Sequence, residues 1–286
     1  MSARQCNFTQ MSALAGPETI ENGFEAINEV IEKSSGPEIS ISAEPIFHIG
    51  SFAVTNAQIL SVTAFLLFVI VALIIRRKIS MIPRGIQNVM EWFMDFMLEL
   101  MESILGNRQR AEQYFPLIGT VFLFVMFGHW LSLLPGVGSI GITEIHNGES
   151  IFVPLFRSPG ADLNFTIALA IISVFATNFL GMKVLGIKGH LGKFFTFKKP
   201  FPIFSFVGIL ELLSEFIKIV SFSFRMFGNL FAGEVLLIII SFLVGYVVPM
   251  PFLALEMFVG MIQAFIFSML TLVFIGMAIT SHEEAH

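Results

Sequence analysis

The chain has 286 residues, of which 55% are hydrophobic and only 13% are charged, and its formal net charge is -5. Soluble domains carry about 25% charged residues, so this deficit predicts a protein that crosses a membrane several times. The acidic balance gives no reason to expect a nucleic-acid partner. One cysteine, Cys6, excludes an internal disulfide and a cysteine-based metal cluster. The six histidines show no metal-ligand spacing, so no metal and no other cofactor is expected.

Residues 1–48 form a polar, acidic N-terminal segment. Its apolar residues with helical spacing predict a short amphipathic helix; they are Ile20, Phe24, Ile27 and Ile31. The segment has no basic region followed by an apolar stretch, so no cleavable signal peptide is expected. The membrane domain follows it and covers residues 49–286.

The first span is expected at about residues 53–75, which is long enough to cross about 30 Å of hydrocarbon. Basic residues at 76–78 follow directly, and short basic loops stay on the cytoplasmic side. This helix therefore runs from outside to inside, which places the N-terminal segment on the outer side.

Residues 86–104 form a different kind of helix. Its acidic residues make one stripe beside apolar surface, namely Glu91, Asp95, Glu99 and Glu102. A stripe this acidic does not suit lipid. The helix is expected to lie along the interface or in a hairpin with the helix that follows.

Four further spans are expected at about 117–135, 162–182, 203–247 and 251–280. Lysines within 183–199 form the most basic loop, on the same face as the first basic loop. The predicted fold class is an all-α polytopic membrane protein with about five transmembrane helices, the N-terminus outside and the C-terminus inside. His129 lies inside the second span, where helix packing near the far interface is the preferred interpretation.

The helix at 203–247 is unusually long, about 60 Å at 1.5 Å per residue, or twice the hydrocarbon thickness. It must tilt strongly, bend, or begin outside the membrane. Gly228 and Gly233 are candidate bend points, although glycines in membrane helices also permit close packing. The last two helices are therefore expected to be long and tilted.

Polar side chains share one face of this long helix. At about 100° per residue, six of them fall within about 40° of one direction and form a polar stripe: Glu211, Ser214, Lys218, Ser221, Arg225 and Asn229. Glu215 lies off the stripe, and Glu234 points to roughly the opposite side from Arg225. In the last helix, Glu256 and Gln263 are seven residues apart and share a face.

These groups can neutralise one another, with Glu211 paired to Lys218 and the serines bonding between helices. Glu211 and Lys218 also lie near the basic loop, from where they can reach the cytoplasmic interface. Arg225 differs, because no carboxylate lies three or four residues from it on its own helix. A charge at the bilayer centre costs about 2.5–3.5 kcal/mol, so its counter-charge is expected on another helix or another protein.

The stretch "SFSFRMFGNLFAGE", from Ser221 to Glu234, resembles the signature around the essential arginine of subunit a of F-type ATP synthases. The resemblance extends over most of the chain. It includes "ELLSEFIKIVS" upstream, "SPGADLN" at the third span, "QAFIFSMLT" in the last helix and a short C-terminus of acids and histidine.

The resemblance implies a stator subunit with no catalytic site of its own, which packs two tilted helices against a rotating ring of c subunits. The implied partners are the c-ring, the b subunits of the peripheral stalk and membrane lipids. The implied ion is H⁺, and Na⁺ is not excluded, because the deciding ligands lie on the ring. A bacterial inner membrane is favoured over an organellar one.

Arg225 is the residue that the resemblance makes essential, because it would favour the ionised form of each passing ring carboxylate. The outer half-channel positions match Asn229, Glu234, Glu256 and Gln263, with Asp162 and Asn164 on the same path. The inner half-channel positions match Glu211, Ser214, Lys218 and Ser221. Family members commonly combine one histidine with one glutamate where this chain has two glutamates. Two neighbouring carboxylates also suit a proton relay.

Two other classes of protein fit the sequence less well. A self-contained ion-coupled secondary transporter could use the polar stripe for its substrate, but such proteins normally carry internal repeats, and none is evident. An intramembrane hydrolase would need paired aspartates or a Ser/His or zinc motif, and the sequence has none of these.

Overall fold

The computed structural model describes residues 43–49, 52–77, 80, 85–134, 136–137, 140–146, 149–194, 201–245 and 248–280. The strands are β1 (Pro45–Ile49), β2 (Phe52–Thr55), β3 (Gly141–His146) and β4 (Glu149–Pro154). The helices are α3 (Asn56–Arg77), α4 (Ile86–Leu105), α5 (Arg108–Ser132), the short 3-10 helix η2 (Pro159–Ala161), α6 (Leu163–Phe194), α7 (Phe201–Val244) and α8 (Pro249–Thr280). The amphipathic helix expected around residues 20–31 lies outside the described residues.

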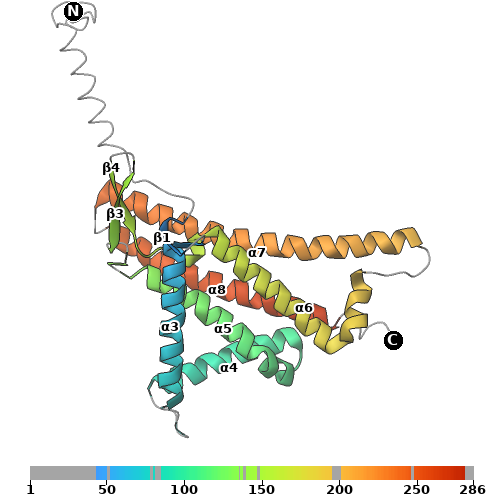
Figure 1. Ribbon diagram of the computed structural model, residues 1–286. Coiled ribbons are helices and arrows are strands. Elements are labelled where there is room, and N and C mark those ends of the chain that lie inside the picture. Colours follow the sequence, from blue (N-terminus) through green and yellow to red (C-terminus); the bar gives the residue numbers. More distant parts are fainter. Residues whose placement is uncertain are drawn as a thin grey trace, which may run out of the picture. The chain divides into compact units, whose positions relative to one another are not determined.

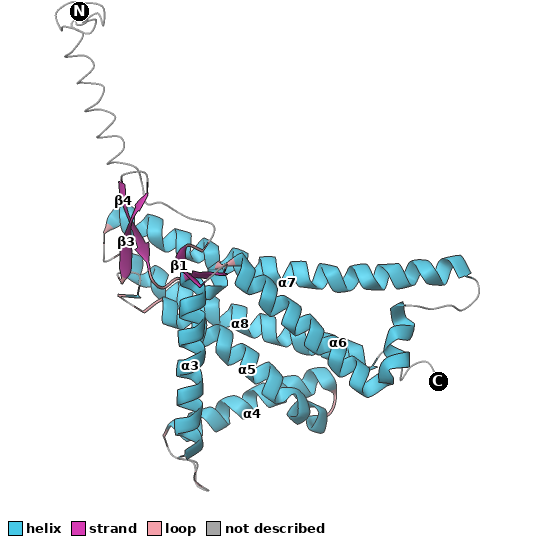
Figure 2. Cartoon of the chain, viewed as in Figure 1, coloured by secondary structure: helices cyan, strands magenta, loops and turns pink. Residues whose placement is uncertain are grey.

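Helices dominate the described chain, as Figure 2 shows. Five stretches are long and apolar enough to cross a membrane: Asn56–Arg77, Arg108–Ser132, Leu163–Ile187, Gly208–Val244 and Pro249–Ile279. The protein is therefore a multi-pass membrane protein, and the predicted all-α polytopic fold class is confirmed.

Helices α4 and α5 form a hairpin. Gly106 ends α4 in the left-handed conformation, with φ of 68°, and its N–H donates to the carbonyl of Glu102 at 2.8 Å. Asn107 then caps α5, because its side chain accepts from the N–H groups of Gln109 at 2.8 Å and Arg110 at 3.4 Å. Of the two arrangements that the sequence left open for the acidic helix, the structure has the hairpin.

The apolar side of α4 supplies part of the core. Met97 and Met101 are fully buried, and the ring of Phe93 stacks on Phe122 of α5 with centroids 5.3 Å apart. The first three acidic residues of the stripe are exposed on the other side. Burial of the apolar side holds the helix in place, while these three carboxylates stay exposed.

Two helix boundaries differ from the sequence prediction. Helix α5 begins at Arg108 and not near residue 117, because the Asn107 cap starts a helix whose first turns are polar and give no hydropathy signal. Helix α6 extends past residue 182 to Phe194, across a kink at Gly186, where φ is 75° and ψ is 157°.

A β-hairpin lies between α5 and η2. Strands β3 and β4 pair antiparallel, from Gly141 opposite Pro154 to His146 opposite Glu149. The dipeptide Asn147-Gly148 stands between the two strands in the sequence, and this dipeptide is a strong hairpin signal. The Gly, Ser and Pro content of the segment obscured that signal.

Aromatic and hydroxyl contacts join α6, α7 and α8. The ring of Phe222 in α7 lies 5.0 Å from that of Phe267 and 5.3 Å from that of Phe274, both in α8. Ser173 of α6 and Thr271 of α8 share a buried hydrogen bond of 2.7 Å. Figure 1 shows α7 crossing the bundle and extending beyond the other helices with its N-terminal part. That part therefore exposes much of its apolar surface to whatever surrounds the protein.

Helix α7 is continuous over 44 residues, which fits the long helix expected from the sequence. Neither candidate bend point, Gly228 or Gly233, is among the described glycines with a positive φ. Both lie within the continuous helix. Gly233 has a packing role, because the side chain of Glu256 lies directly against it.

Candidate functional site

A cavity of about 400 Å³ opens between α5, α7, α8 and the segment that leads from β4 to η2. We call it the outer cavity, because the sequence topology assigns these helix ends to the outer face. Its polar lining comes from His129, Ser132, Arg157, Ser158, Glu234 and Glu256. Apolar side chains such as Leu237 and Leu253 complete the wall. The space is large enough for several ordered waters.

Arg157 and Glu234 form an ion pair at this cavity. The Nε of Arg157 lies 3.3 Å from Oε1 of Glu234, and the two side chains are 7% and 28% exposed. The backbone that carries Arg157 is held by η2, which follows directly and is buried. Breaking a buried pair leaves a charge without compensation, so the contact ties the β4–η2 segment to α7.

His129 of α5 and Glu256 of α8 meet on another side of the cavity. The Nε2 of His129 lies 3.3 Å from the backbone oxygen of Glu256 and 3.5 Å from its carboxylate Oε1. The other ring nitrogen, Nδ1, lies 3.5 Å from the hydroxyl of Ser158. Both side chains are almost fully buried. Residues of α8 and of the β4–η2 segment thus meet at the imidazole ring that α5 carries.

Two glycines make this convergence possible. A β-carbon at Gly233 would overlap the carboxylate of Glu256, and a β-carbon at Gly260 would overlap the ring of His129. The side chain of Glu256 therefore lies directly on the backbone of α7, beside Glu234. Small residues at helix contacts allow this kind of close approach in membrane proteins.

The carboxylates at the cavity are not fully hydrogen-bonded by the protein. Oε2 of Glu234 and Oε1 of Glu256 are buried, and neither has a hydrogen-bond partner within the described residues. Buried polar atoms normally have a partner, from protein or from ordered water. Both atoms belong to side chains that line the outer cavity, and an ordered water or a bound proton would satisfy each of them.

Two more of the sequence-predicted residues meet between α7 and α8. The side-chain amide of Asn229 donates to Oε1 of Gln263 at 2.7 Å, one helical turn from Arg225. Asp162 makes a local contact at the start of α6, where its carboxylate accepts from the backbone N–H of Asn164 at 3.0 Å. Neither Asp162 nor Asn164 is among the residues that line the outer cavity.

Arg225 lies on an exposed side of α7. Its Nη2 donates a hydrogen bond to the hydroxyl of Ser221 at 3.4 Å. Within the described residues it forms no ion pair with a carboxylate. Phe224 beside it is 57% exposed, so apolar surface next to the arginine is left uncovered by the described residues.

The inner part of the polar stripe is arranged differently from the simplest sequence interpretation. Lys218 pairs with Glu215 at 2.6 Å and not with Glu211. The reason is spacing, because residues three apart are neighbours on a helix, whereas residues seven apart are separated by about 10 Å along its axis. Asn178 of α6 donates to the same carboxylate at 3.1 Å, and Lys218 lies 4.8 Å from the ring centroid of Phe274 in α8. Ser214 and Ser221 are exposed, and Glu211 is half-buried.

Sequence reasoning missed part of the outer cavity. The sequence favours a helix-packing role for His129 and assigns no role to Arg157 or Ser158. Arg157 is the one arginine or lysine between residues 136 and 160, and this is a signal that the sequence offers. The position of His129 against α8 depends on tertiary packing at Gly260, and no local pattern reveals it.

The chain is similar to known proteins over most of its length. Residues 58–276 match the family model described as ATP synthase A chain. ATP synthase subunit a of Moorella thermoacetica is 31% identical over 237 residues, which cover 83% of this chain and 96% of that protein. The subunit a of Helicobacter pylori strain Shi470 is 34% identical over 244 residues, with 83% and 97% covered. That of Gloeobacter violaceus is 34% identical over 210 residues, with 73% and 78% covered. With the polar groups gathered on α7 and α8, these matches establish that the chain belongs to the ATP synthase A chain family.

Proposed function

We propose that this chain is the stator subunit that carries protons to and from a rotating c-ring, through two offset half-channels separated by Arg225. The proposal rests on the exposure of Arg225 and on its lack of a carboxylate partner among the described residues. Arg225 is an exposed arginine on a helix long enough to span a membrane, with no carboxylate bound to it within the described residues. An intramembrane charge of this kind marks a functional site by default, with its partner on another element.

Ring carboxylates that arrive in turn would supply that partner. A guanidinium suits the role because it stays protonated and offers several donors, whereas a lysine can lose its proton when desolvated. Its fixed positive charge would also repel protons that moved directly between the half-channels. Protons would then cross only when the ring turns.

The outer half-channel in this proposal begins at the outer cavity. Glu234 and Glu256 line it, and the hydrogen bond between Asn229 and Gln263 leads from there toward Arg225. Asp162 and Asn164 belong to the outer path through the start of α6. The inner half-channel follows the N-terminal part of the polar stripe, with Glu211, Ser214, Lys218 and Ser221. The driving force would be the membrane potential, about 2.3 kcal/mol per charge per 100 mV.

The partners in this proposal are the c-ring, the b subunits of the peripheral stalk and membrane lipids. The transported ion is H⁺, and the bacterial inner membrane is the proposed location. The relatives that match over most of the chain come from bacteria, which supports that location.

The test is Arg225→Ala in the assembled ATP synthase, reconstituted in vesicles and driven by an imposed proton gradient. ATP synthesis should be abolished, while the complex should still purify with its ring. Phe175→Leu is the matched control, since Phe175 is 67% exposed on α6 and belongs to neither half-channel. Near-normal synthesis in Arg225→Ala would contradict the proposal. Transport by the purified chain alone would instead favour a self-contained transporter.

A further inference from the structure

His129 has a defined hydrogen-bonding state in the fold. Its Nε2 faces the backbone oxygen of Glu256 at 3.3 Å, and a carbonyl oxygen only accepts hydrogen bonds. The neutral ring therefore carries its hydrogen on Nε2. Nδ1 is then a bare acceptor that faces the hydroxyl of Ser158 at 3.5 Å. This nitrogen is the one that can take up a proton from the side of the cavity.

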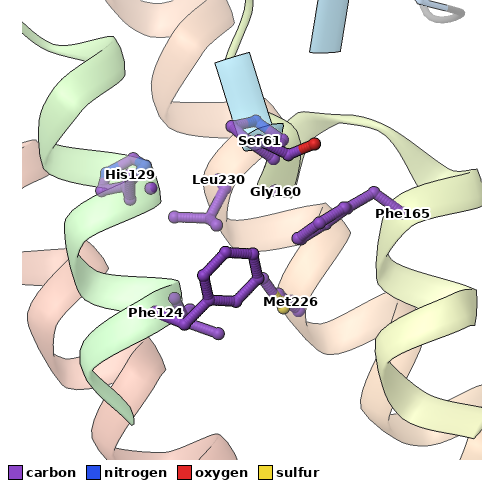
Figure 3. A pocket seen from close by; sticks show the side chains of 10 residues that line it. Ser61, Phe124, His129, Gly160, Phe165, Met226 and Leu230 are labelled. Atoms are coloured by element: carbon purple, nitrogen blue, oxygen red, sulfur yellow. The ribbon is translucent and has the colours of Figure 1, made fainter. Parts of the chain in front are cut away.

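The ring lies at the boundary between the outer cavity and a dry layer of packing. It lines the cavity of about 400 Å³, and it also lines a pocket of about 10 Å³ between α3, α5, α6 and α7. Figure 3 shows this pocket surrounded by Phe124, Phe165, Met226 and Leu230, with Ser61 at its edge. Such a volume holds one water at most, and its apolar walls offer few partners. A proton on His129 thus has a polar route toward the cavity and Glu256, and none through the packing layer.

The contacts around the ring leave capacity for a further proton. All three polar contacts of the ring lie between 3.3 and 3.5 Å, at the long end of the hydrogen-bond range. Oε1 of Glu256, which faces Nε2, has no hydrogen-bond partner in the described chain. The arrangement places a ring that can carry a proton beside a carboxylate oxygen that can accept one.

From this geometry we propose that His129 is a proton-transfer group of the outer half-channel, which passes protons from the outer cavity to Glu256. The inference rests on the proposed function and adds helix α5 to the path. In the step, Nδ1 binds a proton from cavity water through the Ser158 hydroxyl. The Nε2–H bond then breaks as an O–H bond forms on the Glu256 carboxylate. Cavity water then removes the proton on Nδ1 and supplies one to Nε2. This returns the neutral ring to its Nε2–H form. One proton has then moved from cavity water to Glu256.

The experiment uses the assembled ATP synthase in vesicles, with ATP synthesis driven by a K⁺ diffusion potential. His129→Ala and His129→Gln should each lower the rate at least about tenfold, since a positioned acid–base group contributes about 10²–10⁴. The glutamine can still donate a hydrogen bond but cannot relay a proton. Trp130→Phe is the matched control, because it removes a neighbouring bond from α5 to the backbone of α8, from Nε1 to the oxygen of Met257 at 3.0 Å. It should keep the wild-type rate.

Chemical rescue separates proton transfer from packing. Imidazole should restore part of the rate in His129→Ala, because truncation enlarges a cavity that the ring already lines. Thiazole, a weaker base without an N–H, should not. Full activity in His129→Gln, or a loss in His129→Ala that imidazole does not restore, would overturn the inference. The variant Arg225→Ala keeps the two proposals distinct. If Arg225→Ala still makes ATP, the proposed function is contradicted. If Arg225→Ala is inactive and imidazole fails to rescue His129→Ala, only the role of His129 is contradicted.

Discussion

Two arginines lie close to α7, and their surroundings are opposite. Arg157 is buried and pairs with Glu234 at 3.3 Å, so it belongs to the fixed structure of the outer cavity. Arg225 is exposed and makes no ion pair with the described carboxylates. A buried ion pair and an uncovered charge on a membrane helix both cost free energy, because the charges are removed from water. Only the uncovered charge requires a partner from outside the chain.

The Arg157–Glu234 pair should behave as one unit. Arg157→Gln or Glu234→Gln alone should lower the stability of the complex by about 3–5 kcal/mol, because each leaves the other charge buried without this partner. The double variant should recover most of that loss, since neither charge remains. The measurement is the thermal midpoint at which the purified complex dissociates, and purely additive losses would contradict the coupling. ATP synthesis should stay low in every variant that lacks the Glu234 carboxylate.

At the residue level, the sequence predicted more of α7 than of the outer cavity. Helical geometry alone placed Glu234 on the opposite side from Arg225, and the structure agrees, since Glu234 faces the cavity and Arg225 is exposed. His129 and Arg157 depend on how α5 and the β4–η2 segment meet α8 and α7, which no helical period encodes. Of the pairings open to Lys218, the structure has the one with Glu215, which is closer along the helix than Glu211.

At the level of elements, hydropathy predicted the five membrane helices, because a span of about 30 Å demands a long apolar run. The ends of helices and strands that depend on caps and turns were harder to predict from the sequence. The start of α5 depends on the Asn107 cap, and the β3–β4 hairpin depends on a two-residue turn signal within a glycine-rich segment. The kink of α6 at Gly186 lies in a basic region, beyond the apolar run that hydropathy detects.

A polar node between α6, α7 and α8 should hold these helices together. Lys218 pairs with Glu215, and Asn178 of α6 donates to the same carboxylate. A double-mutant cycle with Glu215→Gln and Lys218→Met should give a coupling of about 0.5–3 kcal/mol in the stability of the complex. The matched cycle with Glu211→Gln and Lys218→Met should give almost none. Equal coupling in the two cycles would show that the observed pairing is wrong.

At the level of the whole molecule, the proposed path follows α7 through the membrane. Glu211 and Glu234 are separated along the helix axis by about 35 Å at 1.5 Å per residue, close to the hydrocarbon thickness of about 30 Å. Arg225 lies between them, nearer the outer cavity. In the proposed function, these groups would serve the two sides of the membrane, with the fixed positive charge of Arg225 between them.

The central claim is that the uncovered side of α7 around Arg225 faces the ring, and disulfide cross-linking measures this most directly. The background is Cys6→Ser, and the ring carries a cysteine one turn from its carboxylate. Ser221→Cys and Gly228→Cys, both at exposed positions, should form a cross-linked product with the ring on oxidation. Ser223→Cys should not, because Ser223 is fully buried and lies 3.1 Å from the hydroxyl of Thr166 in α6. A ring product from Ser223→Cys but from neither exposed position would contradict the claim.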